Sequence, residues 1–372
     1  MEERRKTIVA LDAMGGDFAP AQQVKGAVEA VCENKNIVVK LFGIEEQVRA
    51  ELAKYSYPEE QIEVIHTPTV IETADPPVLA IKTKKDSSMV RGLFSVRNKE
   101  ADAFISCGCT GALLVGGQTI VGRIRGIQRG ALAFVMPSLK GPVLMIDCGA
   151  NADARPEMLL QFAQMGSIYM EHIVGVKNPK VGIVNIGEEE EKGNLLVKET
   201  FPLLKACDSI NFVGSVESRG IPEGEVDVVV CDAFVGNVIL KMYEGVSTAL
   251  IHKIKDVLMS STKTKIGALL IKSDLKNMLK DFSSDAYGGA PMLGLKNLVV
   301  KPHGNSSAAV IKNAILQCEA FVAADIVGKI AENITDQKAG EEPANQPKEE
   351  KQPEEEKKAE PAESSEPAKQ EE

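Results

Sequence analysis

Tryptophan is absent from this chain of 372 residues, and aromatic residues make up only 4% of it. No apolar run approaches the roughly 18 residues that a membrane-spanning helix needs, and the first residues contain no apolar signal region. We therefore expect a cytoplasmic protein. Its core must consist mainly of Val, Ile, Leu and Ala, which suits a large α/β domain.

The seven cysteines form no recognisable framework. They are odd in number and scattered through a long chain, which indicates reduced thiols in a reducing compartment. The C-x-C of Cys107 and Cys109, with Cys148 and Cys231 at other strand ends, matches no zinc pattern. We therefore expect no metal site and no cofactor.

The chain also lacks a basic excess. Its net charge is −10, but residues 335–372 contain 6 Lys and 13 Asp or Glu and so carry seven of those charges. The remainder is nearly neutral, which argues against a nucleic-acid-binding protein. The tail from Thr335 to Glu372 is almost entirely Glu, Lys, Pro, Ala, Gln and Ser, and we expect it to be disordered.

Glycine-rich turns are abundant. Six times, a short apolar strand is followed by such a turn and then by a helix. The turns are DAMGGD (12–17), CGCTGA (107–112), DCGAN (147–151), IGEEEEKGN (186–194), DAFVGN (232–237) and PHGNSS (302–307). In a parallel sheet, the turns after the strands gather at one edge, where helix N-termini bind anions. The sequence therefore predicts an oxyanion pocket and a phosphate-handling enzyme.

Strands and helices are predicted to alternate along the chain, which favours a mostly parallel sheet. The predicted strands are 7–11, 37–42, 62–66, 103–106, 143–147, 181–186, 210–213, 226–231 and 298–301. The predicted helices are 20–33, 45–54, 78–99, 156–175, 194–206 and 306–333.

One stretch, residues 236–282, contains no predicted strand. Its apolar residues fall on two helical faces separated by the polar segment SSTKTK, which starts at Ser260. We therefore expect a helical hairpin inserted into the sheet domain.

The motifs occur in the order found in one family. DAMGGD, TGALL, GRIRGI (122–127), DCGAN, EKGN, YGGAPMLGLK (287–296) and KPHG resemble bacterial phosphate acyltransferases of the PlsX family, over residues 7–333. The resemblance implies a three-layer α/β/α fold for residues 1–334, related to phosphotransacetylases and isocitrate-type dehydrogenases. It also implies a homodimer and the transfer of a long-chain acyl group from acyl carrier protein to inorganic phosphate, the start of phospholipid synthesis.

The residue chemistry agrees with that reaction. Phosphate is a competent nucleophile near neutral pH, and a thiol with a pKa of about 8.5 is a good leaving group. Positioning and electrostatic stabilisation can therefore supply most of the rate without a covalent enzyme intermediate.

Each predicted site residue also has a structural interpretation. Gly15, Gly16 and Asp17 are predicted to bind phosphate, or they form only a tight capped turn. Lys192 and Asn194 are predicted to bind phosphate or the developing oxyanion, although Lys192 ends a charged run that could simply be solvated.

Amides and an imidazole complete the predicted site. Asn151 and Asn237 could orient the substrate or cap helices. His303, beside Gly304, could protonate the leaving thiolate or be structural.

The turn that contains Thr110 and Gly111 is predicted to bind substrate through the TGALL motif. Cys109 replaces the Asn usual in the family at this turn, which puts that amide contact in doubt. An acyl-thiol intermediate on Cys109 is the alternative, but no nearby sequence feature supplies an activating base.

Two basic groups are predicted to dock the acidic acyl carrier protein, unless they are plain solvated faces. They are Arg123, Arg125 and Arg129, and the helical row Lys272, Lys276 and Lys280. The lysine-flanked apolar residues Ile266, Leu269 and Leu270 are predicted to touch the membrane peripherally, near the glycerol-3-phosphate acyltransferase that uses the product; packing against a dimer partner is the alternative.

Two other functions are open to the sequence. A metal- and nicotinamide-dependent decarboxylating dehydrogenase would use Asp12, Asp17, Asp147 and Asp232, but the chain has no GxGxxG and no arginine cluster suited to a carboxylate substrate. The second alternative is a non-enzymatic scaffold that passes acyl groups between proteins at the membrane.

Overall fold

The computed structural model describes residues 5–281 and 288–335. Its centre is an 11-stranded sheet with the strand order β3-β2-β1-β4-β11-β10-β5-β6-β9-β7-β8. The strands are β1 (Thr7–Asp12), β2 (Ile37–Gly43), β3 (Ile62–His66), β4 (Ala103–Ile105), β5 (Ala131–Ser138), β6 (Gly141–Ile146), β7 (Lys180–Asn185), β8 (Asn211–Glu217), β9 (Val228–Val230), β10 (Ala290–Leu293) and β11 (Leu298–Lys301).

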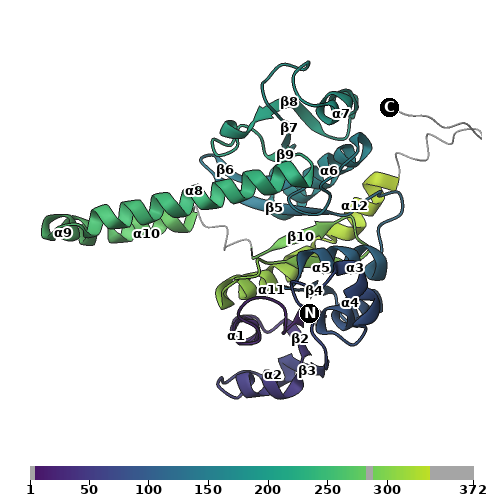
Figure 1. Ribbon diagram of the computed structural model, residues 1–372, viewed down its shortest axis with the longest axis vertical. Coiled ribbons are helices and arrows are strands. Elements are labelled where there is room, and N and C mark those ends of the chain that lie inside the picture. Colours follow the sequence, from purple (N-terminus) through teal and green to yellow (C-terminus); the bar gives the residue numbers. More distant parts are fainter. Residues whose placement is uncertain (1–4, 282–287, 336–372) are drawn as a thin grey trace, which may run out of the picture.

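Helices connect most of these strands (Figure 1). They are α1 (Ala21–Glu33), α2 (Glu45–Leu52), α3 (Pro77–Thr83), α4 (Ser88–Arg97), α5 (Thr110–Gly116), α6 (Pro156–Tyr169), α7 (Leu195–Lys205), α8 (Ala233–Met259), α9 (Thr262–Leu270), α10 (Lys272–Asp281), α11 (Ala308–Ala323) and α12 (Ile326–Thr335).

The sheet has a separate hydrophobic core on each face. Val9 and Leu11 of β1 belong to one core and Ala10 to the other, because successive side chains of a strand point to opposite faces. Helices α1, α6 and α11 cover the first core, whereas α4, α5 and the start of α8 cover the second. The predicted three-layer α/β/α fold with a mostly parallel sheet is confirmed.

Two strands, β5 and β10, were not predicted from the sequence. Both pair antiparallel with their neighbours. They reverse the strand direction at the centre of the sheet. We call β1–β4 and β11 with their helices the first half, and β6–β9 with theirs the second half. All strands within one half are parallel, but the two halves run in opposite directions.

This reversal corrects the expectation of one shared edge. The turns after β1, β4 and β11 leave the first half together, and those after β6, β7 and β9 leave the second half together in the opposite direction. The register of β10 and β5 puts the ends of β11 and β6 at nearly the same level, so the two groups approach each other near the centre of the sheet. The six glycine turns therefore form two groups of three.

Two long predicted helices are divided. Ser87 accepts a hydrogen bond from the amide of Val90 and so starts α4 as a new helix after α3. Asp325 has a φ of +47°, which separates α11 from α12.

Helices α8, α9 and α10 project far from the sheet as an elongated arm (Figure 1). The predicted polar turn is shorter than SSTKTK, because Ser261 and Thr264 form a capping box that starts α9. In the described ranges, no helix is both long enough and apolar enough to cross a bilayer.

Candidate active site

The first group of turns is held together by hydrogen bonds between distant segments. The amide of Asp17 donates to the carbonyl of Gly304 over 2.8 Å, and the Ser106 hydroxyl donates to Asp12 over 2.6 Å. Gly16 has a φ of +105°, and a Cβ there would lie 2.8 Å from the Gly304 carbonyl oxygen. This position therefore requires glycine, and the structure brings Gly15, Gly16, Asp17 and Gly304 together.

Lys301 lies beside this first group, and the sequence-based site omitted it. Its ammonium donates to the carbonyls of Pro302 over 2.6 Å and Cys107 over 3.3 Å. Burial lowers the pKa of Lys301, whereas Cys107, Cys109, Asp12 and Asp17 oppose this shift. The available signal was a lysine at the end of an otherwise buried strand, immediately before a glycine turn.

The second group of turns is organised by Asp147. This buried carboxylate accepts hydrogen bonds from the amides of Leu132, Gly149, Ala150 and Asn151. The side-chain amide of Asn151 donates to Asp147 over 2.7 Å and to the Gly130 carbonyl over 2.9 Å. Both of its donor hydrogens are therefore used within the fold, which gives Asn151 a structural role.

The start of α8 lies against the same group. Its amide at Ala233 donates to the Asn151 carbonyl over 2.9 Å. A Cβ at Gly236 would collide with the backbone of Asp147, so only glycine fits this contact. Asn237 follows in the first turns of α8, whose N-terminus is capped by Asp232 rather than by Asn237.

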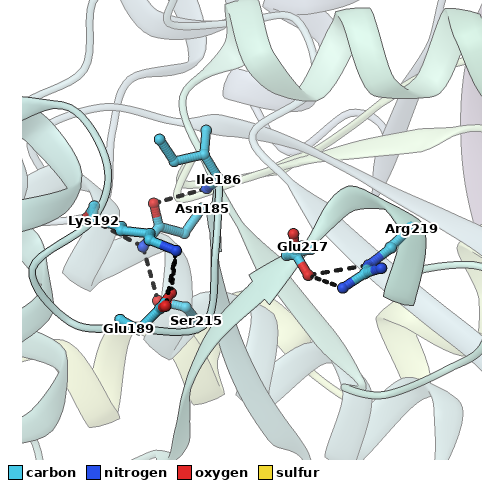
Figure 2. A network of polar contacts seen from close by, with 7 residues as sticks. All are labelled: Asn185, Ile186, Glu189, Lys192, Ser215, Glu217 and Arg219. Atoms are coloured by element: carbon cyan, nitrogen blue, oxygen red, sulfur yellow. Dashed lines mark hydrogen bonds and ion pairs between the residues drawn. The ribbon is translucent and has the colours of Figure 1, made fainter.

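Lys192 lies in the loop after β7, at the same edge of the sheet as this second group. Figure 2 shows its side chain directed at Glu189, with the two charged groups 2.8 Å apart. Asn185 at the end of β7 holds the loop by donating to the Lys192 carbonyl over 3.2 Å and to Ser215 over 3.0 Å. Asn194 caps α7 through the amide of Val197.

His303 lies apart from Lys192, in the first half, and meets the second half through α8. Its Nε2 is 3.1 Å from the carboxylate of Glu244, and its ring packs edge-on against Phe134 with centroids 6.0 Å apart. Glu244 lies two helical turns beyond Asn237, on the same face of α8 and about 10 Å along its axis. Helix α8 therefore connects the two groups of turns.

The turn after β4 is tightly packed. A Cβ at Gly111 would lie 2.7 Å from Pro77, so close packing alone explains the glycine at this position. Thr110, in contrast, is exposed. Cys109 is 9% exposed and starts α5 without a side-chain capping bond. Burial raises the pKa of neighbouring Cys107 to about 12, which disfavours that thiol as a nucleophile.

The predicted docking residues are exposed. Arg123, Arg125 and Arg129 lie between α5 and β5, where Arg129 donates to Gln118 over 3.0 Å and Arg123 to the Gln128 carbonyl. Lys272 and Lys276 are exposed on α10, and the side chain of Lys280 lies outside the described residues.

The predicted membrane residues lie on α9, at the far end of the arm (Figure 1). Ile266, Leu269 and Leu270 are 59%, 71% and 79% exposed.

The fold resembles that of two solved phosphotransacetylases. A phosphotransacetylase from Streptococcus pyogenes superimposes with a TM-score of 0.56 at 17% identity, over 85% of this chain and 94% of that one. A phosphotransacetylase from Staphylococcus aureus gives 0.53 at 14% identity, over the same shares.

Comparison of the amino-acid sequence with known proteins gives stronger matches. The family described as "Fatty acid synthesis protein" matches residues 7–329. A phosphate acyltransferase of Clostridium novyi is 50% identical over 326 residues, which cover 88% of this chain and 98% of that protein. A phosphate acyltransferase of Alkaliphilus oremlandii is 50% identical over 327 residues, which cover 88% and 97%. The order of motifs, the fold and these near-complete matches agree, and the chain belongs to the phosphate acyltransferase family.

Proposed function

We propose that this protein transfers a long-chain acyl group from acyl carrier protein to inorganic phosphate, giving acyl phosphate for phosphatidic acid and phospholipid synthesis. The observation that carries the proposal is the 50% identity, over 98% of its length, to a relative named phosphate acyltransferase. The two groups of glycine turns support it, because backbone amides and nearby cations suit a phosphoryl group and a tetrahedral oxyanion.

In this proposal, a phosphate oxygen attacks the thioester carbonyl carbon, and the carbonyl π electrons move onto oxygen. The tetrahedral intermediate then collapses, the C–S bond breaks, and its electron pair leaves on sulfur. A proton on His303 passes to that thiolate. The products are acyl phosphate and the free thiol of the carrier.

Lys192 and Asn237 are assigned to the charged oxygens. Lys192 is half exposed on a loop, so it can exchange Glu189 for an incoming phosphate at small cost. The Asn237 amide, in the first turns of α8, would donate to the developing oxyanion. The loop that carries Lys192 and the helix that carries Asn237 follow adjacent parallel strands, β7 and β9, at one edge.

The acyl carrier protein would dock on exposed cations. Arg123, Arg125 and Arg129 lie just before Gly130, whose carbonyl accepts a hydrogen bond from Asn151 in the second group, whereas Lys272 and Lys276 lie on the arm. Acidic partners associate faster with such basic groups, and salt screens the attraction.

The arm would serve the membrane and the dimer. The exposed tip residues Ile266, Leu269 and Leu270, with Lys265 and Lys272 beside them, suit peripheral contact with anionic lipid, near the acyltransferase that consumes the product. Along α8, a row of apolar side chains at four-residue spacing is more than half exposed, which supports a homodimer through this face. The row is Phe234, Val238, Met242, Val246 and Leu250.

The test uses purified full-length protein, an acyl carrier protein thioester and phosphate. We expect loss of the thioester only when phosphate is present, together with acyl phosphate detected by mass spectrometry. Thioester loss that is independent of phosphate would contradict the proposal, as would its absence under all conditions.

A further inference from the structure

His303 is held by contacts from two other elements, α8 and β5. It lies in the turn after β11, Glu244 reaches its Nε2 from α8, and Phe134 of β5 packs against the ring. Nothing in the sequence marked Glu244, which lies within a helix and belongs to no glycine turn.

The contact determines which imidazole nitrogen is free. A carboxylate accepts hydrogen bonds, so Glu244 at Nε2 selects the tautomer in which Nε2 carries the proton. Nδ1 is then the nitrogen left to exchange a proton with a ligand. The interaction with His303 also lowers the pKa of Glu244, more than burial raises it, and nearby Lys241 acts in the same direction. The carboxylate is therefore charged when it meets the ring.

We infer that Glu244 is a positioning residue for His303: it fixes the ring with Nε2–H toward α8 and Nδ1 toward the reacting sulfur. The inference rests on the proposed acyl transfer. When the C–S bond breaks, the Nδ1 proton moves to the thiolate and leaves a neutral imidazole, whose Nε2–H is still bound by Glu244. The same contact thus holds the ring before and after the transfer.

Two substitutions separate orientation from charge. Glu244→Ala removes both the hydrogen-bond acceptor that orients His303 and the negative charge. Glu244→Gln keeps an acceptor oxygen for Nε2–H and loses only the charge. Glu33→Ala is the matched control, because Glu33 forms an exposed ion pair with Lys312 over 2.7 Å, on α1 and α11. Exposed pairs of this kind contribute little to stability.

The kinetic measurement compares two acyl thioester substrates whose thiols differ in pKa. We expect Glu244→Ala to lower kcat roughly 10- to 100-fold, at or below the lower end of the range for general acid catalysis because the imidazole itself remains, and to change the KM for phosphate less than about threefold. Glu244→Gln should recover at least part of this loss. A thioester whose thiol has a lower pKa needs less help from a proton, so the loss in Glu244→Ala should shrink with that donor.

The spectroscopic readout needs no turnover. The chain has four histidines, so selective ¹⁵N labelling gives few signals, and His303→Gln identifies the one from His303. We expect the Nε2–H tautomer in the wild type, in Glu33→Ala and in Glu244→Gln, and a tautomer mixture in Glu244→Ala.

The outcomes distinguish the two proposals. An unchanged His303 tautomer in Glu244→Ala overturns the inference, and so does an equal loss with both donors, even if the enzyme transfers acyl groups. If the wild type shows no phosphate-dependent turnover, the proposed function fails instead, and the catalytic part of the inference with it. Should Glu244→Ala not fold, Glu244→Gln carries the test: a donor-independent loss in this variant counts against a role at the leaving group.

Discussion

The ammonium group of Lys192 lies 2.8 Å from the carboxylate of Glu189, three residues earlier in the same loop (Figure 2). The pair raises the pKa of Lys192 and lowers that of Glu189, so both groups are charged near neutral pH. About half of each side chain is exposed. Phosphate would therefore compete with a weak, solvent-screened partner for this lysine.

Lys192→Ala should lower turnover roughly 10- to 1000-fold; loss of one oxyanion donor typically costs about 100- to 1000-fold, and the solvent exposure of Lys192 extends the range downward. Lys205→Ala is the control, because Lys205 pairs with Glu190 over 2.7 Å beside the same loop. Steady-state rates of thioester loss measure both. A Lys192→Ala enzyme as active as the control would remove Lys192 from the proposed mechanism.

Glu189→Gln should instead lower the KM for phosphate. Without its carboxylate partner, Lys192 is available to the substrate, so we expect the KM for phosphate to fall by up to about fivefold, the most that an exposed ion pair can contribute. Phosphate titrations at saturating thioester give this value. A rise in KM would show instead that Glu189 helps to hold the loop in its active form.

Cys109→Ser should retain activity within about threefold, because the proposed transfer needs no enzyme thiol. Serine also has a hydroxyl that could cap α5, where Cys109 makes no capping bond. Intact-protein mass spectrometry of the wild type after mixing with donor thioester completes the test. An acyl adduct on Cys109 would establish the covalent alternative.

Asp12 should make the stability of the fold depend on pH. Burial raises its pKa above 3.8, against the hydrogen bonds from Ser106 and Met14. The folded state therefore holds this proton more tightly than the unfolded state. Stability is lost as the pH rises from the pKa of Asp12 in the unfolded state to its higher pKa in the folded state. Relative to Asp12→Asn, the wild type should lose Tm as the pH rises from about 4, the ordinary pKa of an aspartate, toward neutrality. A constant difference between the two melting curves would mean that Asp12 keeps an ordinary pKa.

The tip of the arm should bind anionic liposomes reversibly and in a salt-sensitive manner. The double substitution Leu269→Glu with Leu270→Glu should abolish co-sedimentation while soluble turnover persists. Leu139→Glu with Leu203→Glu changes two exposed leucines elsewhere, 65% and 36% exposed, and should leave binding intact. Equal binding by both double variants would rule out the tip as the contact.

The sequence predicted the parallel strands well, because strands buried on both faces are continuous apolar runs. It missed β5 and β10, which both contain proline, a residue that argues against a central strand. These two strands reverse the sheet, so the division of the glycine turns into two groups could not be predicted. Lys192, Asn237 and His303 were predicted from the glycine turns, whereas Glu244 became a candidate only through its contact with His303.

The order of the strands also bears on the order of assembly. The second half is formed by one continuous stretch, from β6 to the start of α8, whereas the first half needs β11 beside β4, a partner about two hundred residues away in sequence. Chains emerge from the ribosome N-terminus first, and contiguous units form before distant pairings. The half that begins the chain is therefore expected to close last, when β11 and α11 have been synthesised. Until then, the edge of β4 and the apolar face of α1 are without their native cover.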